Sequence, residues 1–171
     1  MNKILRLALL SLLLFTFSSV HANEKAVGKS AMEFTLEDQF SQKWSWSNHW
    51  KGKPTILVMS DWKGSDYANR WTAPLVARFK DRVQYVALAD VSLAPSFLKG
   101  YLRDRFKGVY QHSVLLDWDG DVFTHYVAQP GLANVLYIDS SGIVRLHTWG
   151  QGAQDHVEKF ANALDLLLTA P

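Results

Sequence analysis

The chain has 171 residues, of which 48% are hydrophobic and 20% charged, and its formal net charge is +2 at pH 7. It contains no cysteine, which excludes a thiol nucleophile, a cysteine metal ligand, thiol-disulfide exchange and thiol peroxidase activity. Residues 1–22 carry two basic side chains and no acidic one, so the other 149 residues hold 16 of each. This balance gives no indication of nucleic-acid or anionic-membrane binding.

The N-terminus is typical of a secretory signal peptide. A basic start at Lys3 and Arg6 precedes an apolar run over residues 7–17, and Val20 and Ala22 suit the −3 and −1 positions of a cleavage site. The apolar run is too short to span a bilayer core, which needs about 20 residues. We therefore expect cleavage after Ala22, a periplasmic location and no stable membrane anchor after cleavage.

The rest of the chain is expected to form a flexible lead-in over residues 23–30 and one domain over residues 31–169. Alternating or continuous apolar runs predict strands, and apolar residues repeating every three or four positions predict helices. The expected strands are 33–37, 43–46, 54–60, 83–89, 113–117, 133–138 and 143–148, and a helical turn lies within 47–53. The expected helices are 66–82, 94–106, 121–127 and 154–169.

Two of these helices are predicted with a buried face. Helix 66–82 has an apolar residue at every fourth position: Tyr67, Trp71, Leu75 and Phe79. Pro74 inside this helix is expected to kink it. In helix 94–106 we expect Phe97 and Tyr101 to face inward. Strands linked by helices, then a hairpin and a closing helix, predict a three-layer α/β/α sandwich.

Four segments share a pattern with a known group of proteins: GKSAMEFTLED at 28–38, GKPTILV at 52–58, LYIDSSGIV at 136–144 and HTWG at 147–150. In order and spacing they resemble the thioredoxin-like superfamily, specifically its exported branch of TlpA-like and ResA-like thiol-disulfide oxidoreductases and related peroxiredoxins. Met32 stands where that branch has proline. The resemblance covers about residues 28–168 and implies a thioredoxin-like fold with a central mixed sheet and an N-terminal β-hairpin extension.

Two departures from the family pattern remove its redox site. The family has W-C-G-P-C after the central strand, and the closest match here, WKGSD at 62–66, places Lys63 and Asp66 at the thiol positions. The family's cis-proline position corresponds to Ala133. We expect a trans peptide bond there, because a cis bond before a residue other than proline costs about 3 kcal/mol. The resemblance therefore implies the fold in a redox-inactive form.

The resemblance also implies a binding surface beside the former redox site. Thiol enzymes of this fold hold an extended substrate segment against the loop before the cis-proline position, and loss of the thiols need not remove that groove. We therefore expect a non-redox binding or accessory protein of the cell envelope, whose partner is another envelope protein or a peptide, with no cofactor. The expected contact residues are Trp62, Lys63, Asp66, Pro130, Ala133 and Asn134.

Two other functions stay open at this point. An enzyme with non-thiol chemistry would use Lys63, Asp66 or Asp61, although a solvated lysine and a helix cap at Ser65 or Asp66 explain the same residues. A metal- or haem-handling protein would use histidine and aspartate from distant loops. No two of the histidines have the i, i+4 spacing of metal ligands on a helix, and we expect no metal. The histidines considered are His49, His112, His125, His147 and His156.

Two further features have simpler explanations. The DWDGD segment at 117–121 begins like a calcium loop, but the twelfth position is Ala128 and not glutamate, so an ordinary turn is expected. The chain has seven tryptophans, and Trp62 in the former redox loop is as compatible with an exposed position bordering a site as with a buried one.

Overall fold

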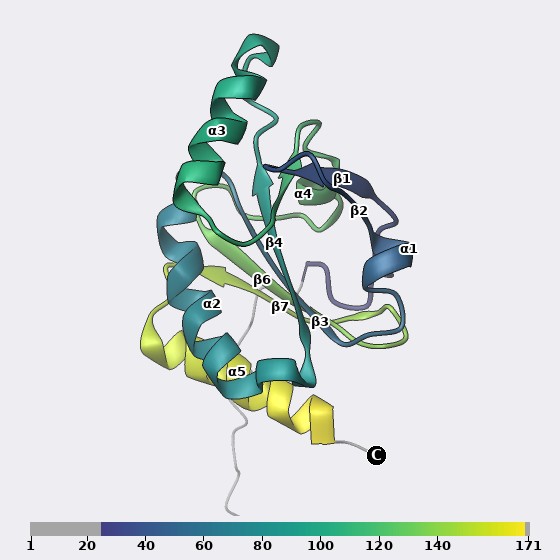
Figure 1. Ribbon diagram of the computed structural model, residues 1–171. Coiled ribbons are helices and arrows are strands. Elements are labelled where there is room, and N and C mark those ends of the chain that lie inside the picture. Colours follow the sequence, from purple (N-terminus) through teal and green to yellow (C-terminus); the bar gives the residue numbers. More distant parts are fainter. Residues whose placement is uncertain (1–24, 170–171) are drawn as a thin grey trace, which may run out of the picture.

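The computed structural model describes residues 25–169, so the predicted signal peptide at residues 1–22 lies outside the described part (Figure 1). The strands are β1 (Thr35–Asp38), β2 (Lys43–Ser45), β3 (Thr55–Ser60), β4 (Gln84–Asp90), β5 (Val114–Asp117), β6 (Ala133–Ile138) and β7 (Val144–Gly150). The α-helices are α1 (Trp46–His49), α2 (Ser65–Phe79), α3 (Lys99–Val109), α4 (Asp121–His125) and α5 (Gln154–Thr169). Short 3₁₀ helices, η1 (Lys80–Arg82) and η2 (Ser96–Leu98), complete the fold.

All seven strands form one mixed sheet in the order β2-β1-β5-β4-β3-β6-β7. The β3–β4 and β4–β5 pairs are parallel, and α2 and α3 supply the crossover connections that parallel neighbours need. The remaining pairs are antiparallel. The predicted N-terminal hairpin is present, with Leu36 of β1 opposite Trp44 of β2. The predicted α/β/α class with a central mixed sheet is confirmed.

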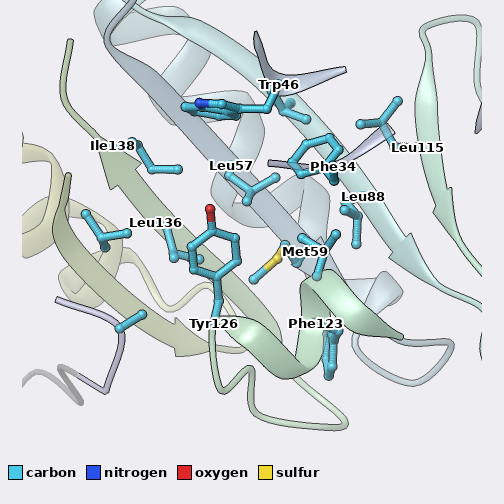
Figure 2. Close-up of a cluster of buried hydrophobic side chains, with 14 of the residues drawn as sticks. Phe34, Trp46, Leu57, Met59, Leu88, Leu115, Phe123, Tyr126, Leu136 and Ile138 are labelled. Carbon is cyan, nitrogen blue, oxygen red and sulfur yellow. The ribbon is translucent and has the colours of Figure 1, made fainter. Parts of the chain in front are cut away.

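The two faces of the sheet bury separate cores. One face packs against α2 and α5, and α3 lies on the same side over β4 and β5. The other face packs against α1, α4 and the segment that leads into β1. Figure 2 shows this second core, in which Tyr126, directly after α4, lies between Leu136 of β6 and Met59 of β3. Every residue of β3 and of β6 is buried, and for β3 the apolar run over residues 54–60 predicts this.

The apolar stripe predicted for α2 is confirmed, because Trp71, Leu75 and Phe79 are fully buried. The inward orientation predicted in the next helix is wrong: the side chains of Phe97 and Tyr101 are 82% and 61% exposed. The chain first forms η2 after Pro95, and this tighter turn shifts the helical phase.

As a result, α3 contacts the sheet with a different set of side chains. Phe106 and Tyr110 lie four residues apart at the end of the helix, and they pack against the core formed by β4 and β5. No residue of α3 itself is fully buried. Among residues 25–169, no helix has both the length and the apolar character needed to cross a bilayer.

The segment predicted to be a flexible lead-in is bound to the domain over residues 25–30. Ala26 is fully buried in the α4-side core, and the backbone N–H of Gly28 donates to the carbonyl of Val144 at 2.9 Å. The N–H of Val144 donates in turn to the carbonyl of Lys29 at 2.9 Å. Backbone pairing to the start of β7 requires no side-chain periodicity, so the residue pattern carries no sign of it.

The buried histidine of β7, His147, has an unusually low pKa. His147 is only 2% exposed, and neither of its ring nitrogens has a hydrogen-bond partner. Burial, with a further contribution from the positive charges of Lys25 and Lys29, lowers the pKa of His147 to about 4. The folded protein therefore holds this imidazole in its neutral form at neutral pH.

We expect the free energy of unfolding to fall on mild acidification because of His147. The pKa of His147 is lower in the folded chain than the ordinary 6.5. The folded state therefore keeps its full free energy of unfolding above pH 6.5, and this group reduces that free energy as the pH falls toward 4. Between pH 7 and pH 5 this group alone should cost about 2 kcal/mol. Urea unfolding at both pH values should show that His147→Leu removes this part of the loss. An equal loss in the variant and the wild type would contradict it.

The turn that ends α4 contains a strained valine. Val127 has a φ of 54°, and it stands at the position of a helix-ending turn where glycine is usual. The N–H of Val127 donates to the carbonyl of Thr124, and the N–H of Ala128 donates to the carbonyl of Phe123, both at 3.0 Å. A β-branched side chain is unfavourable in this left-handed conformation.

Val127→Gly should therefore stabilise the protein by about 1 kcal/mol, since relief of strain outweighs the greater freedom of glycine in the unfolded chain. Val127→Ala keeps a side chain in the same conformation, and we expect it to gain less. Urea unfolding of both variants tests the assignment, which is wrong if the glycine variant is less stable than the wild type.

Candidate functional site

Two loops meet beside the N-terminus of α2, where the family has its redox site. The first runs from Asp61 to Gly64, directly after β3, and the second covers residues 127–132 before β6. The Asp61 carboxylate joins them. Its Oδ1 accepts the backbone N–H of Gly64 at 2.7 Å, and its Oδ2 accepts the N–H of Gly131 at 2.8 Å.

The backbones of the two loops are also in direct contact. A Cβ atom added at Gly64 would lie 2.3 Å from the carbonyl oxygen of Leu132, which is closer than any real contact. Gly131 adopts a φ of 77°, a conformation that glycine permits without strain. The peptide bond between Leu132 and Ala133 is trans, as predicted.

A buried asparagine fixes the second loop from below. Asn134 is fully buried in β6, and its Oδ1 accepts the N–H of Gln129 at 2.6 Å. Its Nδ2 donates to the carbonyls of Gln129 at 3.0 Å and Leu132 at 3.1 Å. With the N–H of Gly131 bound to Asp61, these backbone groups are already paired within the chain. The N–H groups of Gln129 and Gly131 are therefore not free to pair with an added strand.

The structure separates the predicted contact residues into two groups. Trp62, Lys63, Asp66 and Pro130 are exposed beside the joined loops, whereas Ala133 and Asn134 are fully buried. The exposed side chains are available to a partner. The buried pair supports the loop from inside and cannot contact a partner in this conformation.

Trp62 is the most prominent side chain at this site, with 64% of its surface exposed. The guanidinium of Arg105, on α3, lies over its ring at 4.8 Å from the ring centre. Sequence reasoning did not identify Arg105, because a basic residue on a helix gives no sign of which distant loop it will meet.

The helix cap expected at Ser65 or Asp66 is wrong. Gly64 occupies the N-cap position without a side-chain cap, and the Ser65 hydroxyl donates to the carbonyl of Trp62 at 2.8 Å. Asp61, three residues before the cap, instead accepts the N–H of Gly64. An aspartate followed three residues later by a glycine that begins a helix was a usable sequence signal for this turn.

The geometry gives little support to catalysis at these loops. Within residues 25–169, neither Lys63 nor Asp66 forms an ion pair, and both oxygens of Asp61 are occupied by backbone donors. Hollows of about 280 and 190 Å³ lie on the described surface, but none of these three residues lines either. The site is an exposed surface, whereas catalytic sites are usually enclosed.

The described residues also do not assemble a metal site. In residues 25–169, no three histidine, aspartate or glutamate side chains come together as possible ligands. The segment that begins like a calcium loop is a turn, as predicted. Asp117 accepts the N–H groups of Gly120, Val122 and Phe123 at 3.0–3.1 Å. Burial, with a further contribution from the charge of Asp90, raises the pKa of Asp117.

Substitution of Gly64 tests the contact between the two loops. Gly64→Ala should destabilise the protein by about 2–3 kcal/mol, because its methyl group overlaps backbone atoms of Leu132 that cannot move aside. Gly108→Ala is the matched control: apart from the neighbouring backbone of α3 itself, nothing lies within 4 Å of its Cβ position, and alanine should stabilise the helix by up to about 1 kcal/mol. Equal effects of the two variants on urea unfolding would contradict the described packing.

The structure is similar to solved thioredoxin-like proteins. A protein assigned as the thiol:disulfide interchange protein DsbE from Chlorobium tepidum has a TM-score of 0.63 and 18% identity, covering 83% of this chain and 97% of its own. The pneumococcal exposed lipoprotein thioredoxin from Streptococcus pneumoniae has a TM-score of 0.61 and 17% identity, covering 77% and 98%. A thiol peroxidase from Chromobacterium violaceum has a TM-score of 0.55 and 12% identity, covering 82% and 86%.

Comparison by sequence matches the chain to no protein-family model and to no curated protein. At the identities of the solved structures, the likeness establishes the fold and not the activity. The redox chemistry named for those proteins requires thiols, and this sequence has no cysteine. The chain therefore has the thioredoxin-like fold, in a form that cannot carry out thiol chemistry.

Proposed function

We propose that the protein is a non-redox binding module of the cell envelope, and that the surface around Trp62 holds a peptide or protein partner. The observation that carries the proposal is a large aromatic side chain, 64% exposed, on a loop whose backbone is fixed from two sides. An exposed tryptophan beside an arginine combines two residue types enriched among the main energetic contacts of protein interfaces.

The rigidity of the site favours binding. Because Asp61 and Asn134 already hold the loops, a partner would not have to order them, and the entropic cost of association is reduced. Since Asn134 and Asp61 occupy backbone groups of the second loop, the partner would be held by side chains and not by an added strand. Trp62, Lys63, Asp66 and Pro130 are the proposed contacts.

The proposed envelope location is supported by the sequence of residues 1–22, which has the three parts of a signal peptide. Among the structural neighbours, one is named as an exposed lipoprotein, which is consistent with this location. No observation of comparable weight supports non-thiol catalysis, metal binding or haem binding.

Site-directed photo-crosslinking in living cells tests the proposal. A photoreactive residue at position 63 should give one reproducible protein adduct, and the same probe at position 159, exposed on α5, should give none. Trp62→Ala, combined with the probe at position 63, should reduce the adduct about tenfold, since truncation of such a side chain commonly costs about 1–2 kcal/mol or more of binding energy. The absence of a specific adduct at 63, or an adduct unaffected by Trp62→Ala, would argue against a partner at this surface.

A further inference from the structure

Residues 25–30, which we call the strap, cross one face of β7. At one end of this crossing, the ammonium of Lys25 lies 5.6 Å from the centre of the Trp149 ring. At the other end, the backbone N–H of Gly28 donates to the carbonyl of Val144 at 2.9 Å. The strap therefore runs along the stretch of β7 that lies between Trp149 and Val144.

His147 lies on this stretch and on the face that the strap covers. It stands opposite Leu136 of β6, and directly opposite residues of neighbouring strands share a face. Leu136 belongs to the same core as Ala26 of the strap, and the ring of His147 lies 5.2 Å from that of Trp149, centre to centre. The imidazole is thus buried beneath the strap. Among residues 25–169, neither of its nitrogens has a hydrogen-bond partner.

The strap brings two positive charges to His147 and no negative one. Lys25 and Lys29 are the charged groups that act on the imidazole, and together with burial they lower its pKa. Protonation of His147 would create a buried cation, with no hydrogen-bond acceptor in the described chain, beneath two lysines. Such a charge is costly unless it is paired, and the cost is relieved when the strap lifts and water reaches the ring.

No carboxylate of the described residues acts on His147 from the other elements packed on this face. Tyr126, directly after α4, is neutral because burial raises its pKa to about 12. The Nε2 of His125 lies 3.4 Å from the carbonyl of Ser30, and a protonated ring can still donate to this oxygen. The carboxylates of the flanking segments bind other groups: Asp139 binds Arg145, and Glu33 accepts the N–H of Ser47.

The strap is held to the domain by few contacts. Ala26 is its one buried residue, and the side chain of Lys29 donates to the carbonyl of His125 at 2.8 Å. Two backbone hydrogen bonds join Gly28 and Lys29 to Val144, and the N–H of Ala31 follows with a bond to Gly142. A segment with little buried apolar surface and a few hydrogen bonds opens at a lower free energy than the core.

We infer that the strap is a pH-sensitive device, in which protonation of His147 releases residues 25–30 from β7 while the rest of the fold stays in place. β7 is the last strand in the sheet order, so release leaves the N–H and carbonyl of Val144 unpaired at the edge of the sheet. Release also uncovers the space in the core that Ala26 fills. Acid thus changes the surface of the protein at this edge without unfolding it.

Hydrogen exchange of the purified protein at pH 7 and pH 5, corrected for the intrinsic exchange rate of each amide, tests the inference. The opening ratio of the Gly28 and Ala31 amides should rise about 20-fold between these pH values, because the pKa of His147 moves from about 4 to the ordinary 6.5 on opening. At both pH values this ratio should exceed that of the β3 amides, which are buried at the centre of the sheet.

Three variants assign the effect to His147. His147→Leu should make the opening ratio of the strap nearly equal at pH 7 and pH 5, because leucine cannot be protonated. His125→Leu is the matched control, since it removes the neighbouring histidine that also contacts the strap, and it should keep the rise. Lys25→Met should reduce the rise, because loss of one positive charge brings the pKa of His147 closer to its ordinary value.

Four results would overturn the inference. They are a strap that opens only together with β3, a wild-type opening ratio that does not rise on acidification, a rise that persists in His147→Leu, and a rise that disappears in His125→Leu. The comparison of strap and β3 amides is made within the wild type, so it decides the matter even where a variant does not fold.

Discussion

The candidate site depends on one carboxylate. Asp61 follows the central strand β3, and its two oxygens hold the start of α2 and the loop before β6 in a single unit. Gly64 lies directly against the backbone of Leu132, and Trp62, between Asp61 and Gly64, is 64% exposed. The tryptophan is therefore presented on a loop whose backbone is held to the neighbouring loop by one carboxylate.

Exposed aromatic side chains of the protein lie on two neighbouring elements. Trp62 is presented by the joined loops, and Phe97 by the segment that leads into α3, while Arg105 connects the two by lying over the tryptophan ring. The helix that carries Arg105 is attached to the sheet mainly near its C-terminal end, where Phe106 and Tyr110 pack on the core. This weak attachment is the feature of the fold that most distinguishes α3 from α2 and α5, whose apolar stripes are buried.

The fold was predictable because its main signals are local. The continuous apolar sequence of β3 and the four-residue repeat of α2 each specify an element and its buried face without knowledge of the rest. Phe97 was misplaced because one 3₁₀ turn after Pro95 changes the helical phase, and periodicity alone cannot locate such a turn. Docking of residues 25–30 on β7 uses backbone groups, which carry no residue-specific signal.

The site was predictable in location and only partly in composition. The position of the loop after the central strand located Trp62 and Lys63 beside the site, although the sequence was equally compatible with a buried and an exposed Trp62. The burial of Asn134 and the approach of Arg105 depend on contacts between distant segments, for which a single sequence holds no pattern. The role of Asp61 was predictable in part. Its spacing to Gly64 in the sequence indicated the first hydrogen bond, but nothing in the sequence indicated the second, to Gly131.

The direct contact between Gly64 and Leu132 bears on whether cysteines placed in this loop would give a working oxidoreductase. Two cysteines placed at positions 63 and 66 would stand beside a loop whose Gly131 N–H and Leu132 carbonyl are already engaged by Asp61 and Asn134. A disulfide-bearing substrate would find thiols beside a loop whose Gln129 and Gly131 N–H groups are already bound within the chain. Such a graft would introduce thiols without restoring the backbone surface that aligns a substrate, so oxidoreductase chemistry would need further substitutions at Asp61 and Asn134.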